Sequence, residues 1–151
     1  MLTPEMEKLI REHTIGLVAT VTPEGTPSVS PKATTMIISP QEIVFCDIRS
    51  PKTRRNIESN PNVEINYINV FSRQACRVTG VASYVSLGAK EFANLKEQFK
   101  SWDQGFLDAI RGFFRVKINK AQLILSPVYD RGANENDLKE QWLSKYTELL
   151  S

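Results

Sequence analysis

Short segments with the residue preferences of β-strands follow one another with only tight turns between them, and this succession constrains the fold most. Apolar and β-branched residues fill six such segments, at residues 15–22, 27–38, 42–47, 63–71, 75–85 and 113–125, the last bent near Asn119. Thr22-Pro23-Glu24-Gly25 is typical of a tight turn. Among the first five of these segments only one helical segment intervenes, residues 51–59, and it is too short for the crossovers of a parallel sheet. The pattern therefore predicts a mainly β fold, an antiparallel barrel with peripheral helices.

Three further segments have helical periodicity, one near each end of the chain and one between the fifth and sixth strand segments. Thr3-Pro4 begins a short amphipathic helix at one end of the chain. A second helix is predicted over residues 88–101, where large apolar residues recur at i, i+3, i+7 and i+10. A final helix is predicted over about residues 136–150. Because no repeat, linker or low-complexity stretch interrupts the chain, we expect residues 1–151 to form a single domain.

The segment from Phe45 to Pro61 has the composition of a phosphate site at a helix start. An apolar strand is followed by four cations, Arg49, Lys52, Arg54 and Arg55. Ser50 fits the N-cap and Pro51 the first helical position, and Asn60-Pro61 ends the helix after roughly two turns. Backbone N–H groups, the positive end of the helix dipole and a lysine converge at such a start. The alternative is a solvated cationic helix that binds no ligand.

The charge and the cysteines limit the expected partners and location. A net charge of +2 is weak for a nucleic-acid binder, and no apolar run approaches the ~20 residues that span a bilayer. The first residues are charged and helix-like, unlike a signal peptide. Cys46 and Cys76 lie in apolar or alternating runs, so we expect buried thiols, which suit a reducing compartment. A cytoplasmic protein that binds neither nucleic acid nor membrane is predicted.

The usual motifs for metals and nucleotides do not occur in this chain. His13 is the only histidine, and its place at the end of the first helix favours a helix C-terminal cation over a zinc ligand or a triad member. Neither GxGxxG nor GxxxxGK[ST] is present. A nucleotide, if bound, would need a different scaffold.

Three motifs follow one another along the first half of the chain. They are Gly16-Leu-Val-Ala-Thr-Val with Gly25-Thr-Pro-Ser-Val-Ser-Pro-Lys32, then Phe45-Cys-Asp-Ile-Arg-Ser-Pro-Lys-Thr53, then Arg73-Gln-Ala-Cys-Arg-Val-Thr-Gly80. In order and spacing they resemble the pyridoxamine 5′-phosphate oxidase-like, FMN-binding split-barrel superfamily, over about residues 5–126. The resemblance implies a six-stranded antiparallel Greek-key split β-barrel. It also implies a homodimer with two FMN sites at the dimer interface.

The resemblance further implies which residues hold the FMN phosphate. A flavin needs a cationic end for its phosphate, an apolar slot for its ring and donors near N1 and O2. Lys52 and Thr53 would hold the phosphate, with Asp47, Arg49 and Ser50 nearby. This assignment gives the cationic segment a specific ligand.

The flavin ring would lie along the second strand of the opening hairpin. The resemblance places Val29, Ser30, Pro31, Lys32 and Ala33 along the isoalloxazine edge, with Ser30 and Lys32 as its polar contacts, and brings Gln74 toward the ring across the dimer interface. A proline inside a strand also marks an edge or a bulge, where a ligand can meet backbone groups. The alternative for Lys32 is an exposed edge lysine that discourages aggregation.

The C-terminal part departs from the vitamin B6 oxidases of this superfamily. Those enzymes end in an Arg-rich, proline-containing strand that grips the substrate phosphate. Here Arg131 is the only cation between Lys120 and Lys139. We therefore expect no oxidation of pyridoxamine phosphate.

The function expected from these features is that of an FMN-binding flavoprotein. It would transfer hydride or electrons from a reduced nicotinamide or a protein donor to an acceptor that the sequence does not identify. No catalytic side chain is evident, so the flavin would carry the chemistry. A non-enzymatic FMN-binding or redox-sensing stress protein and a deazaflavin-binding reductase stay open as alternatives. Haem is disfavoured because His13 lies outside the predicted pocket.

Overall fold

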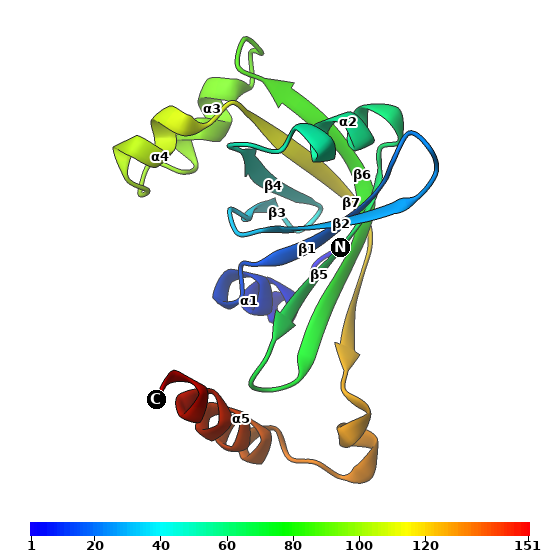
Figure 1. The fold of residues 1–151 in the computed structure, drawn as a ribbon, viewed down its shortest axis with the longest axis vertical. Helices are drawn as coiled ribbons and strands as arrows, with labels where there is room; N and C mark the ends of the chain where they lie inside the picture. Colours follow the sequence, from blue (N-terminus) through cyan, green and yellow to red (C-terminus); the bar gives the residue numbers. More distant parts are fainter.

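The computed structural model describes residues 1–151 and contains one antiparallel sheet of seven strands with helices around it (Figure 1). The strands are β1 (Gly16–Val21), β2 (Pro27–Lys32), β3 (Met36–Ser39), β4 (Glu42–Asp47), β5 (Asn62–Asn69), β6 (Gln74–Ser86) and β7 (Gly112–Leu125). They are hydrogen-bonded in the order β2-β1-β5-β6-β7-β4-β3. The meander β5-β6-β7 with β4 beside β7 is a Greek-key arrangement. Because β2 and β3 lie at opposite edges, the sheet is not closed.

The predicted count of six strands was wrong by one, because the stretch 27–38 divides into two strands. β2 pairs with β1 and β3 pairs with β4, at the two edges of the sheet, so the chain must leave one ladder before joining the other. Residues 33–35 make this crossing. The Thr34 hydroxyl accepts a hydrogen bond from the Cys46 N–H (2.8 Å), and the Thr35 and Tyr67 hydroxyls lie 3.0 Å apart. Side-chain hydrogen bonds therefore fix the crossing where no strand partner is available.

The helices surround the sheet and differ in part from the sequence prediction. They are α1 (Pro4–Glu12), α2 (Pro51–Ser59), α3 (Phe92–Glu97), α4 (Gln104–Ala109), the 3-10 helix η1 (Pro127–Arg131) and α5 (Glu135–Leu150). The cationic helix α2 has the predicted bounds. The single helix predicted over 88–101 is wrong: α3 ends early, and the Asp103 carboxylate starts α4 by accepting from the Phe106 N–H (2.9 Å). None of the helices combines the length and the apolar character that crossing a membrane requires.

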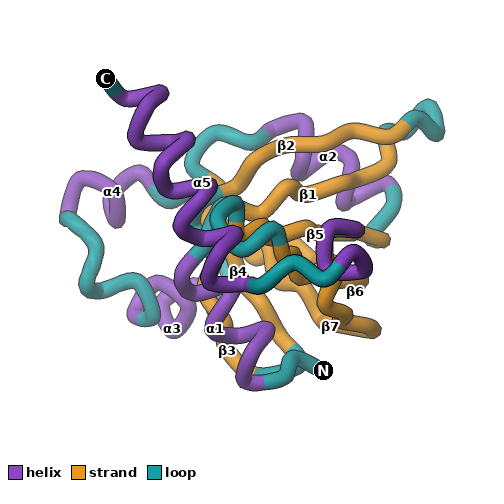
Figure 2. Tube along the Cα trace, turned by 90° about the horizontal axis from the view of Figure 1, so that it is seen from below, coloured by secondary structure: helices purple, strands orange, loops and turns teal.

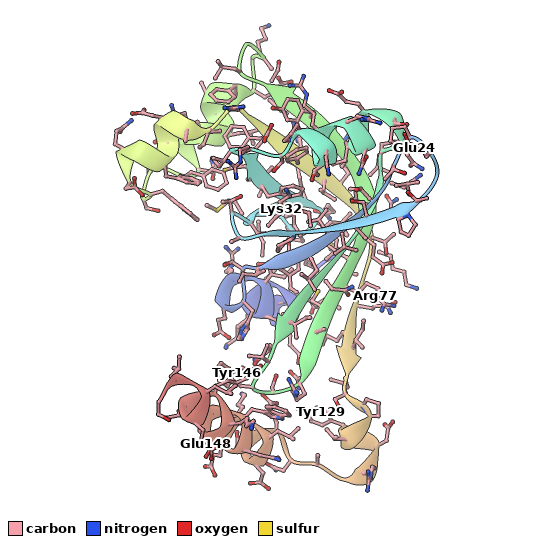
Figure 3. The ribbon with its side chains drawn as sticks, viewed as in Figure 1. Glu24, Lys32, Arg77, Tyr129, Tyr146 and Glu148 are labelled. Atoms are coloured by element: carbon pink, nitrogen blue, oxygen red, sulfur yellow. The ribbon has the colours of Figure 1, made fainter.

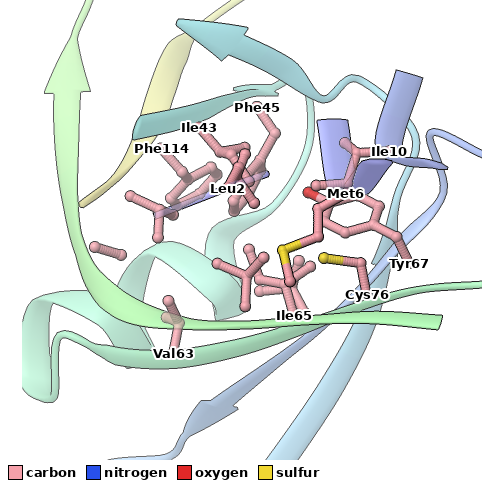
Figure 4. Close-up of a cluster of buried hydrophobic side chains, with 14 of the residues drawn as sticks. Leu2, Met6, Ile10, Ile43, Phe45, Val63, Ile65, Tyr67, Cys76 and Phe114 are labelled. Carbon is pink, nitrogen blue, oxygen red and sulfur yellow. The ribbon is translucent and has the colours of Figure 1, made fainter. Parts of the chain in front are cut away.

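Apolar side chains from the strands and from α1 fill the interior of the curved sheet (Figure 4). Phe45, Ile65, Tyr67 and Phe114 are fully buried, and the rings of Phe45 and Phe114 stack with their centroids 4.9 Å apart. Tyr67 keeps its hydroxyl paired within this core, which satisfies its polar end. The core therefore ties the crossing segment to the strands opposite it.

A second apolar cluster lies on the other face of β4 and β7, under the segment that contains α3. Phe92 and Phe99 from that segment pack on Phe113, with ring centroids 5.2 and 5.6 Å away. Val44 and Cys46 join them from β4. Burial on both faces explains why residues 43–46 read as a continuous apolar run.

Both cysteines are buried and free, as predicted. Burial raises the pKa of Cys46 to about 12 and that of Cys76 to about 11. Both thiols are therefore protonated near neutral pH and act as small apolar groups.

The C-terminal helix α5 stands apart from the barrel, at the far end of β5 and β6 (Figures 1 and 2). It contacts the tip of the β5–β6 hairpin: Tyr146 meets Phe71 edge-on at 5.6 Å between centroids, and the Arg73 guanidinium lies 3.4 Å above the Trp142 ring. The helix begins at Glu135 because the Asn134 side chain accepts from the next amides. Aromatic and cation–π contacts to one hairpin tip therefore hold it.

The last strand is one long strand that bends at Asn119, as the sequence indicated. In the pairing with β6, Thr79 lies opposite Lys120 but Gly80 lies opposite Ile118, which leaves Asn119 as the extra residue of a bulge. At Gly80 an added Cβ would stand 2.3 Å from the Lys117 carbonyl oxygen. The bulge therefore requires glycine on the facing strand.

We predict that Gly80→Ala lowers the free energy of unfolding by about 1–3 kcal/mol, because backbone must shift to admit the methyl group. Urea unfolding followed by tryptophan fluorescence measures the change. Gly88→Ala is the control, since a Cβ there meets nothing within 4 Å, and it should change stability by less than about 0.5 kcal/mol. Equal stabilities for the two variants would contradict the packing at the bulge.

Candidate functional site

An open cleft of about 1030 Å³ lies between the crossing segment after β2 and the loop that joins β4 to α2. The segment from α4 to the start of β7 forms its third wall. The lining residues are Ser30, Pro31, Lys32, Ala33, Thr34, Cys46, Ile48, Arg49, Ser50, Leu87, Asp108, Ala109, Ile110 and Arg111. In Figure 3 Lys32 lies below α2, on the side from which α3 and α4 project. Apolar and cationic groups from distant parts of the chain meet in this cleft.

A chain of hydrogen bonds joins β2 to the start of α2. The Lys32 ammonium donates to the Ser50 hydroxyl (2.7 Å), and the Ser50 N–H donates to Asp47 Oδ1 (2.9 Å). Ser50 is the N-cap residue of α2, as predicted, but its hydroxyl accepts no hydrogen bond from the amides of the helix. The amides of Lys52 and Thr53 find no acceptor in the chain. The helix start is left with free donors beside an ammonium group.

Asp47 is buried behind the cleft, and both its carboxylate oxygens are used. Oδ2 accepts a hydrogen bond from the Tyr84 hydroxyl (2.7 Å), while Oδ1 holds the Ser50 amide. The Arg54 guanidinium covers the Tyr84 ring at 4.1 Å from its centroid. Burial, together with the hydrogen bond to Asp47 and its charge, raises the pKa of Tyr84 to about 12. Tyr84 is therefore a stable hydrogen-bond donor near neutral pH.

The cleft has a positive electrostatic character at its α2 end. Lys32, Arg49 and Arg111 contribute positive charge, and Asp108 is the one acidic residue of the lining. Burial lowers the pKa of Lys32 from its usual value, and the Asp47 charge opposes that shift. An anion at this end would be attracted by the charges and by the helix dipole together.

The structure brings six of the predicted site residues into the cleft. Ser30, Pro31, Lys32, Ala33, Arg49 and Ser50 line it. Asp47 lies directly behind and contacts Ser50. Lys32, predicted beside the ring, therefore lies with the residues predicted beside the phosphate.

Four predicted residues lie elsewhere. Val29 is exposed on the outer face of β2, and Thr53 is buried under α2. Lys52 lines a separate polar hollow of about 280 Å³ between α2 and the β1–β2 turn. Gln74 lies at the far end of β6, where its amide donates to the Tyr129 hydroxyl (3.4 Å). In a single chain these residues do not join the cleft.

Several residues of the site carried no signal in the sequence. Tyr84 sits in an ordinary alternating strand, and Ile110 and Arg111 follow a helix that was not predicted. Ile110 and Arg111 line the cleft and Tyr84 lies behind it, because β7 pairs with both β4 and β6, which brings Gly112 opposite Asp47. Only the register in which β7 pairs with β4 and β6 could have identified them. No group of three or more His, Cys, Asp or Glu side chains is placed to hold a metal ion.

Comparison with solved structures identifies the fold. HupZ of Group A Streptococcus is 26% identical, with a TM-score of 0.71 over 83% of this chain and 96% of that one. The haem storage protein HutZ of Vibrio cholerae is 23% identical, with a TM-score of 0.62 over 82% and 94%. An FMN-binding protein of Syntrophomonas wolfei is 14% identical, with a TM-score of 0.66 over 80% and 84%. The last two likenesses concern the fold alone.

Comparison with protein families gives one match, and it agrees with the resemblance of the three motifs. The model of the family described as pyridoxamine 5′-phosphate oxidase matches residues 2–125, from the segment before α1 to the end of β7. None of the curated proteins matches the chain significantly. The family match spans the whole sheet and every residue of the cleft, and the chain belongs to the pyridoxamine 5′-phosphate oxidase family in its split-barrel form.

Proposed function

We propose that the protein is an FMN-binding flavoprotein that transfers hydride or electrons from a reduced nicotinamide or a protein donor to a small-molecule or protein acceptor. The observation that carries this proposal is the cleft, where an apolar wall and a cationic end meet beside an uncapped helix start. A flavin phosphate and its ring need these two environments side by side. Membership of the family and an FMN-binding neighbour of the same fold support FMN as the ligand.

The start of α2 is suited to the phosphate. The free amides of Lys52 and Thr53 can donate to phosphate oxygens, and the Lys32 ammonium lies beside them at Ser50. Arg49 borders the same end of the cleft. Lys52 and Thr53 would act through their backbone, with Lys52 adding charge from the adjacent hollow. This arrangement gives an anion hydrogen bonds as well as charge.

The remaining walls are suited to a flat apolar ring. Ile48, Leu87 and Ile110 offer apolar surface, and Ser30 with Ala33 borders them from the β2 side. Bound FMN would supply the hydride or electron transfer. The side chains of the cleft would orient it and keep water from one face of the ring.

The outer face of β2, β1 and β5 supports a homodimer as the functional form. Ile15, Leu17, Val29 and Ile68 are large apolar side chains left exposed there, and Pro31 borders both this face and the cleft. An exposed apolar patch of this kind marks an interaction surface. A second copy on this face would lie next to the open cleft.

Two rival assignments have weaker support in this cleft. Haem iron needs an axial ligand such as His, Met, Tyr or a thiolate. The only such residue in the lining is Cys46, whose thiol stays protonated because its pKa is raised to about 12. Pyridoxamine phosphate would need a second phosphate site, and the cleft offers one cationic end. A deazaflavin would use the same cleft, and the absorption spectrum of the bound cofactor separates it from FMN.

A non-enzymatic FMN store or redox sensor is the second candidate function. It is favoured by the lining itself, in which Asp108 is the one carboxylate and no histidine is present. Steady turnover with reduced nicotinamide and a quinone or nitro acceptor would decide against it. Absence of turnover with FMN bound would decide for it.

Titration of the purified protein with FMN, followed by quenching of flavin fluorescence, tests the proposal directly. Lys52→Glu should lower FMN affinity at least about tenfold, because it puts a carboxylate at the anion end of the helix. Lys145→Glu on α5 makes the same charge change far from the cleft and should leave affinity unchanged. Wild-type protein that neither contains nor takes up FMN would remove the proposed function.

FMN affinity should fall as the pH rises through the Lys32 pKa. That pKa lies below the usual lysine value because burial disfavours the ammonium form. The charge is complete at lower pH and is lost on the alkaline side, where affinity should fall by up to about tenfold per pH unit. Lys32→Arg keeps its charge at high pH and should abolish the alkaline fall. The same alkaline fall in this variant would show that Lys32 does not contact the phosphate.

The homodimer is tested by light scattering after size-exclusion chromatography. We expect twice the 17.1 kDa mass of one chain. Leu17→Asp should give a folded monomer with weaker FMN binding, because the charge would be buried in the interface. Ala93→Asp on exposed α3 is the control and should stay dimeric. A wild-type mass of 17.1 kDa at micromolar concentration would contradict the proposed assembly.

A further inference from the structure

A hydrogen-bonded pair of side chains, the buried Asp47 and the half-buried Tyr84, stands behind the cleft without lining it. Asp47 comes from the end of β4 and Tyr84 from β6, two strands that are separated in the sheet by β7. The carboxylate is only 5% exposed, and each of its oxygens accepts one hydrogen bond. A buried carboxylate with both oxygens engaged is a rigid group.

Tyr84 is held in place from three sides. Its ring meets Phe114 edge-on at 5.2 Å, and the Arg54 guanidinium covers it at 4.1 Å. At Gly112 an added Cβ would lie 2.2 Å from the Tyr84 hydroxyl oxygen and 2.4 Å from its ring carbon. The hydroxyl therefore occupies space that exists only because position 112 is glycine. This packing fixes the direction of the hydrogen bond to Asp47.

The pair controls the orientation of Ser50 at the mouth of α2. Asp47 Oδ1 accepts from the Ser50 N–H, while the Ser50 hydroxyl accepts from the Lys32 ammonium and does not cap the helix. That diversion is what leaves the amides of Lys52 and Thr53 free. The Asp47 carboxylate therefore acts on the anion end of the cleft through Ser50 and does not itself line the cleft.

We propose that Asp47 and Tyr84 are positioning residues that hold the start of α2 open for the phosphate of the cofactor. This proposal rests on the proposed function, since it assigns the phosphate to the same end of the cleft. Tyr84 fixes Asp47, Asp47 fixes Ser50, and Ser50 fixes Lys32. The free helix amides and the ammonium group then face the anion in a set geometry, so little ordering remains when the ligand binds.

Asp47 has a second, electrostatic effect on the same end. Its charge opposes the effect of burial on the pKa of Lys32 and so keeps the ammonium form at higher pH. The other charged groups that border this part of the cleft are Arg49 and Arg111 on the cationic side and Asp108 on the anionic side. Removal of the Asp47 charge should therefore move the alkaline fall of FMN affinity to lower pH.

The test compares Tyr84→Phe with Tyr129→Phe, a matched control. Tyr129→Phe also removes hydroxyl hydrogen bonds, one to the Ser72 carbonyl and one from the Gln74 amide, but at the opposite end of the barrel (Figure 3). Two ligands are titrated into each variant: FMN, and riboflavin, which lacks the phosphate. In Tyr84→Phe we expect FMN affinity to fall about tenfold and riboflavin affinity to stay unchanged. Tyr129→Phe should bind both as the wild type does.

Hydrogen exchange of the Ser50 amide in the ligand-free protein gives a readout that does not depend on flavin. Exchange should be about tenfold faster in Tyr84→Phe than in wild type, because the acceptor carboxylate loses its anchor. An unchanged exchange rate would overturn the positioning role, whatever the ligand. If wild-type protein binds no FMN, the proposed function fails, and this rate still decides whether the pair positions Ser50.

Asp47→Asn supplies a second variant of nearly the same shape, should Tyr84→Phe fold poorly. The amide oxygen can still accept from Ser50, so the fold should persist while the charge is lost. We expect the alkaline fall of FMN affinity to begin at lower pH than in wild type. An equal loss of FMN and riboflavin affinity in both variants would indicate a general structural role and would overturn the proposal.

Discussion

The crossing of the chain from one edge of the sheet to the other is the constraint on which the rest of the structure depends. β2 and β3 are consecutive but pair at opposite edges, so residues 33–35 must pass between them without a ladder. The Thr34 and Thr35 hydroxyls replace ladder bonds by pairing with the Cys46 amide and the Tyr67 hydroxyl. Because the sheet is not closed and these hydrogen bonds fix the crossing segment, a hollow remains beside that segment. This hollow is the cleft.

Local patterns in the sequence were enough to predict most of the sheet and the cationic helix. Residues 42–47 and 51–59 form β4 and α2 with the predicted bounds, because a short apolar run, Ser-Pro and Asn-Pro are local signals. The break between β2 and β3 could not be read in this way, since it depends on which edges the two strands join. The helix predicted over 88–101 failed for a related reason. Phe99 packs against Phe113 although α3 has already ended before it, and Asp103 begins a new helix where the apolar stripe ends.

The residues of the candidate site divide in the same way, into those that local patterns predicted and those that depend on strand pairing. Ser30, Lys32, Arg49 and Ser50 were predicted and lie together, because they belong to the segments on either side of the crossing. Tyr84, Ile110 and Arg111 were missed, because only the pairing of β7 with β4 and β6 places Ile110 and Arg111 in the cleft and Tyr84 behind it. Ser50 is the N-cap residue, as predicted, but its hydroxyl does not cap the helix. The hydroxyl accepts a hydrogen bond from Lys32, which is distant in the sequence, and not from the amides of its own helix.

The two ends of the cleft differ in what they require from the chain. The α2 end is complete within one chain, because internal hydrogen bonds fix Lys32, Ser50 and Asp47 beside the free amides of the helix start. The apolar end is open, and its walls cover only one side of a flat ring. On the proposed function, the phosphate would therefore determine whether a flavin is held. The surface that closes the apolar end, a second copy of the chain, would determine which donors and acceptors reach the ring. Specificity for the redox partner would then belong to the assembly, while the part of the cofactor affinity that comes from the phosphate would belong to the single chain.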